Sequence, residues 1–301
     1  METDTIKSYF KNYWIAMRVL SLSLALSATS FGLVSAYRKG LMFGENPVHD
    51  IFLIFIITIA GLASQAGANL VNDYFEGSFK YRDPSQKRMK FLGKDRSLFD
   101  VFVFLSGIAA LGLAGLVGLY LIYITDYRML VIGLVGLVGS YAYTGEPFVY
   151  KTKGLGVPLS FILMGPLMLI GAYFPFSKSI ELYPVIMGLP MSLFVPALMI
   201  SNEMRDFKRD KRLSMGTLSI RLGSRKSLLL YDTLVFGAFV LLAVYVVKGL
   251  YPISALLAFV TLPIALKGHE CVSKFERLSI PYTNKLHMTF SFIVFVTLII
   301  G

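Results

Sequence analysis

The sequence predicts an all-α, polytopic membrane protein: a helical bundle of nine transmembrane helices around a central cavity, with a cytoplasmic cap. The first observation is composition. Hydrophobic residues make up 55% and charged residues 16% of the 301 residues, whereas soluble domains contain about 25% charged residues. The second is that the apolar residues form runs close to the ~20 residues that a helix needs to cross a bilayer. The third is the single cysteine, which leaves no pair for an intrachain disulfide. Soluble enzymes, disulfide-bonded secreted scaffolds and fibrous proteins are therefore excluded.

Nine apolar segments follow one another along the chain and form a single transmembrane domain over residues 1–301. The third segment contains glycines at spacings that allow close helix contact. Later segments contain prolines, which membrane helices tolerate where neighbouring helices or a cavity satisfy the freed carbonyl groups. The last segment is short. In order, the segments cover about 13–37, 51–75, 99–124, 128–145, 155–175, 182–201, 228–247, 251–267 and 287–300.

The distribution of basic residues predicts the orientation of the bundle. If the N-terminus lies inside, 24 of the 29 Lys and Arg residues fall on the same side of the membrane, as the positive-inside rule requires. The chain is therefore predicted to be a multi-pass protein of the cell membrane with a cytoplasmic N-terminus. Its net charge of +11 is explained by this topology and by attraction to anionic membrane lipids, so no nucleic-acid partner is expected. Two polar loops, about 76–98 and 202–227, are predicted to meet as the cap.

The first polar cluster closes the second segment. Asn69, Asn72, Asp73 and Glu76 are three or four residues apart, so on a helix they share one face. Asn69 lies within the apolar run, where an unpaired amide is costly. A self-capped helix end that meets lipid headgroups would have a similar composition. The functional interpretation is an oxygen-rich face for a hard cation such as Mg²⁺.

The second polar cluster closes the sixth segment. Asn202, Asp206 and Asp210 recur every four residues, and Arg205 and Arg209 occupy the adjacent stripe. A surface helix with ion pairs between neighbouring turns would have the same composition. The two clusters together favour function, because both lie at the same membrane face and ionisable residues at a membrane edge are functional candidates.

Two facing sets of carboxylates repel each other unless a cation lies between them. Carboxylates with basic neighbours suit a polyanionic substrate that brings Mg²⁺ with it, and the Lys and Arg side chains then contact the remaining phosphate oxygens. An apolar bundle offers room for a long hydrocarbon tail. The inferred substrate is a lipid diphosphate, and a prenyl diphosphate fits best.

At these motifs the chain resembles the UbiA-type intramembrane prenyltransferases. The first family signature is similar to the run Asn72-Asp73-Tyr74-Phe75-Glu76, with Asp83 near the place of a later acidic residue. The second is similar to the run from Asn202 to Asp210, followed by Thr217-Leu-Ser-Ile-Arg221-Leu-Gly223. A basic stretch runs from Arg88 to Lys94, and a tyrosine-containing loop runs from Tyr141 to Pro147. The resemblance covers most of the chain.

The resemblance implies a Mg²⁺-dependent prenyltransferase with two metal sites. The implied metal ligands are Asn72, Asp73, Glu76, Asn202, Asp206 and Asp210. The implied diphosphate contacts are Arg88, Lys94, Arg205 and Lys151. Asn69 and Asp83 would support the ligands. Asp73, Asp206, Asp210 and Tyr143 are the implied catalytic residues, and Tyr143 would stabilise an allylic cation through its ring.

The acceptor is the least determined part of the prediction. Within the family, the motifs look most like the 1,4-dihydroxy-2-naphthoate prenyltransferases of menaquinone synthesis and their vertebrate relatives, which implies a small aromatic acceptor. The archaeal geranylgeranylglyceryl-phosphate geranylgeranyltransferases are the rival, with a glycerol-phosphate acceptor. Glu76 departs from the family's usual Asp but keeps the charge. From another functional class, a membrane transporter would also have many spans and broken helices.

Overall fold

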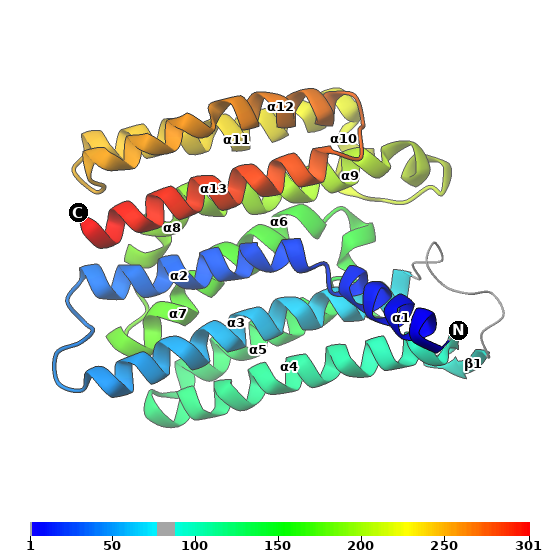
Figure 1. Cartoon of the computed structure of the whole chain (residues 1–301), viewed down its shortest axis with the longest axis horizontal. Coiled ribbons are helices and arrows are strands. Elements are labelled where there is room, and N and C mark those ends of the chain that lie inside the picture. The colour runs from blue at the N-terminus through cyan, green and yellow to red at the C-terminus, as the bar shows by residue number, and fades with distance from the viewer. Residues whose placement is uncertain (1, 77–87) are drawn as a thin grey trace.

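The computed structural model describes residues 2–76 and 88–301 and forms a bundle of roughly parallel and antiparallel helices, with short connections at its two ends (Figure 1). The first half contains α1 (Glu2–Met17), α2 (Leu22–Arg38), α3 (Pro47–Glu76), the strands β1 (Arg88–Phe91) and β2 (Lys94–Ser97), α4 (Leu98–Ile124) and α5 (Tyr127–Ala142). The second half contains α6 (Gly156–Ile162), α7 (Met168–Ser177), α8 (Tyr183–Ser192), α9 (Phe194–Arg212), α10 (Leu218–Leu222), α11 (Ser224–Val247), α12 (Leu262–Ser273) and α13 (Ser279–Ile300).

The apolar segments predicted from the sequence are helical. Within the described part of the chain, eight helical stretches are long and apolar enough to cross a membrane, and the segment predicted at 128–145 forms the shorter α5 of 16 residues. The count of nine spans therefore stays a prediction. The last span is longer than expected, because α13 begins at Ser279, ahead of the uniformly apolar residues.

The first predicted span is interrupted. Helix α1 ends at Met17, Arg18 adopts the left-handed conformation with φ 51°, and a single 3₁₀ turn, Val19–Ser21, leads into α2. A non-glycine residue with positive φ breaks the α-helical hydrogen-bond ladder. Helix α1 then turns away from the axis of α2 and crosses the ends of α3 and α4 (Figure 1).

Three of the spans are composite helices. Between α6 and α7 lies a π turn, Leu163–Leu167, that contains Pro166, whose ring and missing N–H break the α pattern. Helices α8 and α9 follow each other directly at Leu193, and a 3₁₀ segment, Ile253–Thr261, leads into α12. Of the prolines expected within the spans, Pro166 lies in the π turn and Pro263 lies in the first turn of α12, directly after the 3₁₀ segment, whereas Pro190 lies inside α8.

The largest hydrophobic core lies in the second half of the chain, where α9, α11 and α13 pack together. Phe194 and Phe290 are fully buried there, with ring centroids 5.1 Å apart. A smaller core joins α2, α3, α4 and α7 around Phe174. Many outward-facing apolar side chains stay exposed, for example Leu116 and Phe292, as expected for a surface that faces lipid.

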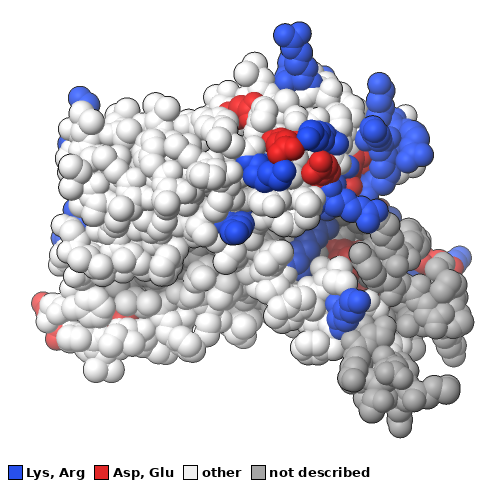
Figure 2. All heavy atoms as spheres, turned by 45° about the horizontal axis from the view of Figure 1, so that its top comes forward, with Lys and Arg blue, Asp and Glu red and all other residues white. Residues whose placement is uncertain are grey.

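Charged residues gather at one end of the bundle. Figure 1 shows that α3, α9 and the N-terminal helix all have their polar ends at the right, where β1 also lies. Figure 2 shows Lys, Arg, Asp and Glu side chains concentrated on the right half of the visible face, whereas the left half carries charge only at its edge. The two predicted cap regions therefore lie at the same end, which we call the polar end.

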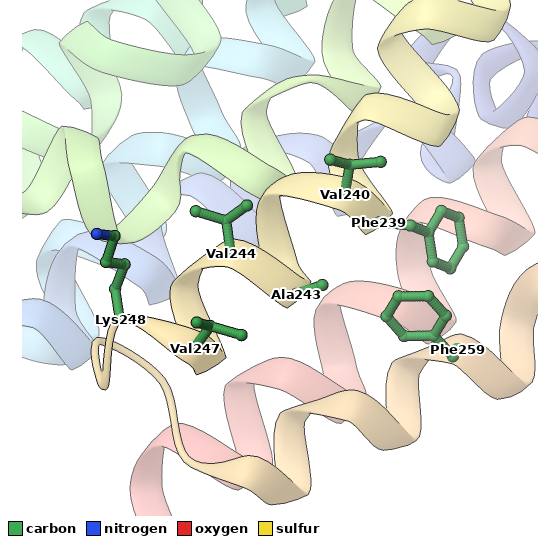
Figure 3. A pocket seen from close by; sticks show the side chains of 7 residues that line it. All are labelled: Phe239, Val240, Ala243, Val244, Val247, Lys248 and Phe259. Carbon is green, nitrogen blue, oxygen red and sulfur yellow. The ribbon is translucent and has the colours of Figure 1, made fainter.

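A groove of about 530 Å³ lies at the opposite end of the bundle, on α11 and the 3₁₀ segment before α12 (Figure 3). Its walls are apolar, with Lys248 at one edge: Phe239, Val240, Ala243, Val244, Val247, Lys248 and Phe259. This groove is not the central cavity expected from the sequence, which stays a prediction.

Candidate active site

The first acidic motif is enclosed at the C-terminal end of α3. Asn72 and Asp73 are 1% and 5% exposed, and the neighbouring Tyr74 is fully buried among aromatic rings. Its ring centroid lies 4.8 Å from that of Phe104 on α4. The helix places Asn72 and Asp73 on successive positions of its last turns, so a tightly packed aromatic cluster holds the backbone that presents them.

A β-hairpin fastens the end of α3. The guanidinium of Arg96 donates to the backbone carbonyl oxygens of Tyr74 (3.1 Å) and Phe75 (3.4 Å). These carbonyls lie in the last turn of the helix, where no intrahelical donor is left for them, and a cation there also suits the helix dipole. In return, the hydroxyl of Tyr74 donates to the carbonyl oxygen of Phe91 on β1 (2.6 Å). Arg96 was not predicted as a site residue, and only its place among the basic residues of this loop pointed to it.

Asn69 forms hydrogen bonds to residues at the break between α1 and α2. Its amide nitrogen donates to the carbonyl oxygen of Met17 (2.9 Å) and to the hydroxyl of Ser21 (2.9 Å). Gln65, one turn earlier on α3, donates to the side-chain oxygen of Asn69 (3.3 Å). Because a buried amide must find partners, Asn69 ties the helix break to α3 just before Asn72 and Asp73. Asn69 is predicted to support the metal ligands, and these hydrogen bonds are the contacts through which it would do so.

The predicted tyrosine-containing loop forms part of the connection from α5 to α6, residues 143–155, which contacts the hairpin. The name is used below for this whole connection. The ammonium of Lys94 on β2 forms an ion pair with Glu146 (2.9 Å) and lies 5.9 Å from the ring centroid of Phe75. Tyr150 is buried and donates its hydroxyl to the carbonyl oxygen of Gly139 (3.0 Å). Burial raises the pKa of Tyr150, so its hydroxyl remains a donor. Lys94, predicted as a diphosphate contact, here joins the hairpin to the loop.

Tyr143 and Lys151 place the same loop against α9. The hydroxyl of Tyr143 lies 3.7 Å from the sulfur of Met199, and the ammonium of Lys151 lies 5.6 Å from the Tyr143 ring centroid. Lys151 also interacts electrostatically with the carboxylates of Glu203 and Asp206. The ring of Tyr143, which is predicted to stabilise an allylic cation, therefore has the Lys151 ammonium near it.

The second acidic motif is paired with arginines of its own helix. Arg205 donates two hydrogen bonds to Asp206, at 2.9 Å and 2.5 Å. Arg209 contacts both carboxylates, at 3.2 Å from Asp206 and 2.8 Å from Asp210. The Asp210 side chain is 4% exposed and the Asp206 side chain 22%, so part of the Asp206 carboxylate faces outward. Asn202 lies one turn before Asp206 and is half-buried.

Glu203 is a buried carboxylate that the sequence did not single out. It is 7% exposed, and its carboxylate accepts the backbone N–H of Ser219 at 2.7 Å. The bond anchors the segment after α9, which also packs closely against the tyrosine-containing loop. A Cβ at Gly154 of the loop would clash with the side chain of Arg221, and a Cβ at Gly216 would clash with the carbonyl oxygen of Thr152. Its only sequence signal was an acidic residue beside the stripe of Asn202, Asp206 and Asp210.

The structure thus brings the predicted residues to one end of the bundle and joins them through the tyrosine-containing loop. Only the backbone is described for Glu76 and Arg88, and Asp83 lies outside the described residues. Among the described side chains, no three carboxylate, histidine or cysteine groups come together as a ready-made metal site. The donor set still fits Mg²⁺, which usually binds through one or two carboxylates plus substrate phosphates and not in an all-protein cage.

A profile of the UbiA prenyltransferase family matches residues 16–279, a range that includes both acidic motifs, the hairpin and the tyrosine-containing loop. The chain belongs to the UbiA prenyltransferase family. This confirms the resemblance found in the motifs and the prediction of a prenyltransferase, and the transporter alternative is set aside.

Among curated relatives, the rat UbiA prenyltransferase domain-containing protein 1 is 30% identical over 257 residues, which is 84% of this chain and 73% of that protein. The Drosophila melanogaster homologue of UbiA prenyltransferase domain-containing protein 1 is 29% identical to this chain, over 85% of this chain and 70% of the homologue. The predicted similarity to vertebrate members is therefore confirmed.

Solved structures share the fold of this UbiA-family chain. An apo UbiA homologue from Aeropyrum pernix aligns with a TM-score of 0.65 at 13% identity, covering 92% of this chain and 97% of that one. A UbiA homologue from Archaeoglobus fulgidus bound to DMAPP and Mg²⁺ aligns with a TM-score of 0.55 at 14% identity, covering 94% and 99%. A structure of digeranylgeranylglyceryl phosphate synthase aligns with a TM-score of 0.60 at 19% identity, covering 97% and 98%. The family and the apolar helices together make the chain a multi-pass membrane protein.

Proposed function

We propose that this chain transfers a prenyl group from a prenyl diphosphate to a small aromatic acceptor of the dihydroxynaphthoate kind, in a Mg²⁺-dependent step of quinone synthesis. The observation that supports it most is the arrangement of the polar end. Two helix ends with carboxylates and amides, α3 and α9, lie there. Lys94 on β2 pairs with Glu146 of the tyrosine-containing loop, and Lys151 of the same loop interacts electrostatically with Asp206 on α9. Oxygen donors beside cations are what a metal-bound diphosphate requires.

Mg²⁺ as the cofactor is supported by the homologue that was solved with DMAPP and Mg²⁺ and by the donor chemistry of this chain. When bound, the metal neutralises the charge on the diphosphate. The residues proposed to hold it at two sites are Asn72, Asp73, Glu76, Asn202, Asp206 and Asp210, with Arg88, Lys94, Arg205 and Lys151 on the diphosphate oxygens.

The reaction breaks the bond between the allylic carbon and the diphosphate oxygen, and the electron pair leaves with the diphosphate. A carbon–carbon bond then forms to the acceptor ring, which loses the proton from that ring carbon. Charge builds up on the leaving group in the transition state, so the basic side chains around it accelerate the step. The apolar bundle keeps water away from the allylic cation, which water would otherwise convert to a prenol.

The ion pairs on α9 explain how the second motif is held before substrate binds. Arg205 and Arg209 neutralise Asp206 and Asp210 within the helix. Diphosphate oxygens would offer these arginines charged acceptors as well, and Asp206 and Asp210 would then be available to hold Mg²⁺. Asp206 is the more exposed of the two carboxylates.

Tyr143 and Lys151 act as a pair in this proposal. Lys151 lies over the Tyr143 ring, and an ammonium there would repel an allylic cation. Lys151 therefore turns to the diphosphate oxygens on binding, and the freed ring face stabilises the cation by about 2 kcal/mol when desolvated.

The decisive experiment measures diphosphate release and product mass with purified chain in Mg²⁺. Allylic diphosphates of increasing length are combined with a dihydroxynaphthoate, a hydroxybenzoate and a prenylated glycerol phosphate as acceptors. We expect release that depends on the naphthoate and stops when Mg²⁺ is chelated. Asp126→Asn, which removes one carboxylate of an arginine pair at the opposite end of the bundle, is the matched control and should leave the rate unchanged.

Faster release with the glycerol phosphate would replace the aromatic acceptor by the ether-lipid alternative. Release that persists without Mg²⁺ would contradict the metal dependence, and no release with any acceptor would contradict the proposed reaction.

A further inference from the structure

Helix α1 has one face buried against the bundle. Tyr13, Ala16 and Met17 pack in a small core with α3 and the start of α4. The ring centroid of Tyr13 lies 5.7 Å from that of Phe102, and that of Tyr9 lies 5.4 Å from Phe99. The inner face of α1 is therefore fixed to the first turns of α4.

The opposite face of α1 exposes large aromatic side chains. Phe10 is 69% exposed and Trp14 is 53% exposed, and their rings stack with centroids 6.4 Å apart. Lys11 is exposed beside them. Aromatic rings together with a basic residue on one helix face are typical of a helix that lies in a membrane interface.

The neighbours of α1 indicate the depth at which this face lies. Leu98 and Phe102, in the first turns of α4, are 60% and 56% exposed, so the lipid-facing surface of the bundle begins at the level of α1. The polar end above this level is rich in Lys and Arg (Figure 2). The face with Phe10 and Trp14 therefore lies at the border between the apolar surface and the basic end.

Helix α1 is also connected to the first acidic motif. The break after Met17 leaves a carbonyl oxygen outside the helical ladder, and Asn69 donates to it at 2.9 Å. Asn69 lies one turn before Asn72 and Asp73 on the same helix. A displacement of α1 would therefore act on the turn of α3 that presents these two residues.

We propose that the exposed face of α1 binds the anionic headgroup region of the leaflet at the polar end, and that Asn69 transmits the position of α1 to Asn72 and Asp73. The anchoring half of the proposal is independent of the reaction. The transmission half rests on the proposed function. The partner is an anionic lipid surface, because the exposed aromatic pair carries Lys11 beside it and the surrounding end of the bundle is basic.

Trp14 is the single tryptophan of the chain, so its fluorescence reports on α1 alone. The full chain is reconstituted in vesicles of phosphatidylcholine and phosphatidylglycerol with lipids brominated either near the top or near the middle of the acyl chain. We expect stronger quenching by the shallow bromines. Stronger quenching by the deep bromines would mean that α1 spans the membrane. Quenching by aqueous iodide with none by brominated lipid would mean that it faces water. Either result overturns the anchoring.

The charge dependence is tested with Lys11→Glu. This change should lower shallow quenching about twofold in vesicles with phosphatidylglycerol and have little effect in pure phosphatidylcholine. Lys226→Glu, at an exposed position at the start of α11, makes the same charge change at the same end and should leave Trp14 unaffected. Equal effects of the two variants, or none of Lys11→Glu, would contradict a preference for anionic lipid.

Transmission is tested with Asn69→Leu and the rate of diphosphate release. The unaltered chain should turn over several-fold faster when phosphatidylglycerol is present, and Asn69→Leu should lose this response while Trp14 quenching stays the same. A response that survives in Asn69→Leu, or a shift of Trp14 in that variant, would overturn transmission through Asn69. If no vesicle supports diphosphate release, the proposed function fails, whereas the quenching result still decides the anchoring.

Discussion

The two acidic helix ends look like repeats of each other in the sequence, but the fold builds them differently. At the end of α3, Asp73 is buried and the nearby Arg96 binds backbone carbonyls. At the end of α9, Arg205 and Arg209 bind the carboxylates themselves. The described contacts thus hold the backbone of the first end through Arg96 and the carboxylates of the second end through Arg205 and Arg209. The comparison suggests that the first motif positions the substrate and the second responds to it.

The largest effect is expected from Asp73→Asn. The change removes the carboxylate of a residue that is 5% exposed, and the loss of one preorganised electrostatic group typically costs about 10³-fold in turnover. Diphosphate release at saturating Mg²⁺ is the measurement, with Asp126→Asn as the control. A loss of less than tenfold would contradict the proposed role of Asp73 as a metal ligand.

Asp206→Asn should lower turnover by about 10²-fold, less than Asp73→Asn, because Asp210 remains on the same stripe of α9. We also expect the variant to need more Mg²⁺ for half-maximal rate, since the α9 end has lost a donor. A Mg²⁺ titration of both variants checks this. Near-normal turnover of Asp206→Asn at limiting Mg²⁺ would contradict its role as a ligand.

Two substitutions at Tyr143 examine the loop between the two ends. Tyr143→Phe keeps the ring and should retain much of the activity, whereas Tyr143→Ala should lose about 30-fold, equivalent to the ~2 kcal/mol of a desolvated cation–π contact. The binding constant of a non-hydrolysable prenyl diphosphate should be the same in both. If Tyr143→Phe is as inactive as Tyr143→Ala, the hydroxyl carries the function instead.

Arg96→Met and Arg205→Met compare the two kinds of arginine by stability. Arg96→Met removes two charge-assisted bonds to partly buried carbonyls and should lower the free energy of unfolding by about 1–3 kcal/mol, seen as a lower Tm in detergent. The Asp206 carboxylate keeps Arg209 as a partner when Arg205 is removed, so Arg205→Met should change stability by well under 1 kcal/mol. Equal losses would contradict the distinction between an arginine that holds backbone and one that holds a carboxylate.

The smallest effect is expected from the ion pair between Lys94 and Glu146. Both side chains are partly exposed, and such pairs contribute roughly 0.2–1 kcal/mol. A double-mutant cycle with Lys94→Met and Glu146→Gln should give a coupling of this size in stability. Because Lys94 is also a proposed diphosphate contact, Lys94→Met should raise KM more than Glu146→Gln does.

The sequence predicted the helices well because long apolar runs are strong signals. It missed the break at Arg18, since the run continues through this residue without Gly or Pro. It also placed the start of the last span too late, because Ser279, Thr283 and Asn284 are polar yet buried in α13. The sequence did not predict the hairpin of β1 and β2 within the polar loop 76–98, because its eight residues are mostly polar or charged and show no clear alternation.

For the site, the sequence predicted which residues share a helix face, because helical spacing determines that. Pairings between distant segments, such as Lys94 with Glu146 or Glu203 with the N–H of Ser219, depend on tertiary contacts that spacing does not encode. Helical spacing also could not predict that Arg96 binds the backbone at the end of α3, because Arg96 lies about twenty residues after the turn that it caps.

The π turn at Leu163–Leu167 has a consequence for how this chain aligns with its relatives. A π turn holds about one residue more than an α turn, so α7 follows α6 with its faces shifted by one position. A relative with a continuous α-helix here would align with a one-residue gap in the middle of a membrane span, where gaps are normally penalised. Removing one residue from 163–167 is therefore a deletion that the bundle can absorb, whereas the same deletion in α4 would rotate the rest of that helix by about 100°.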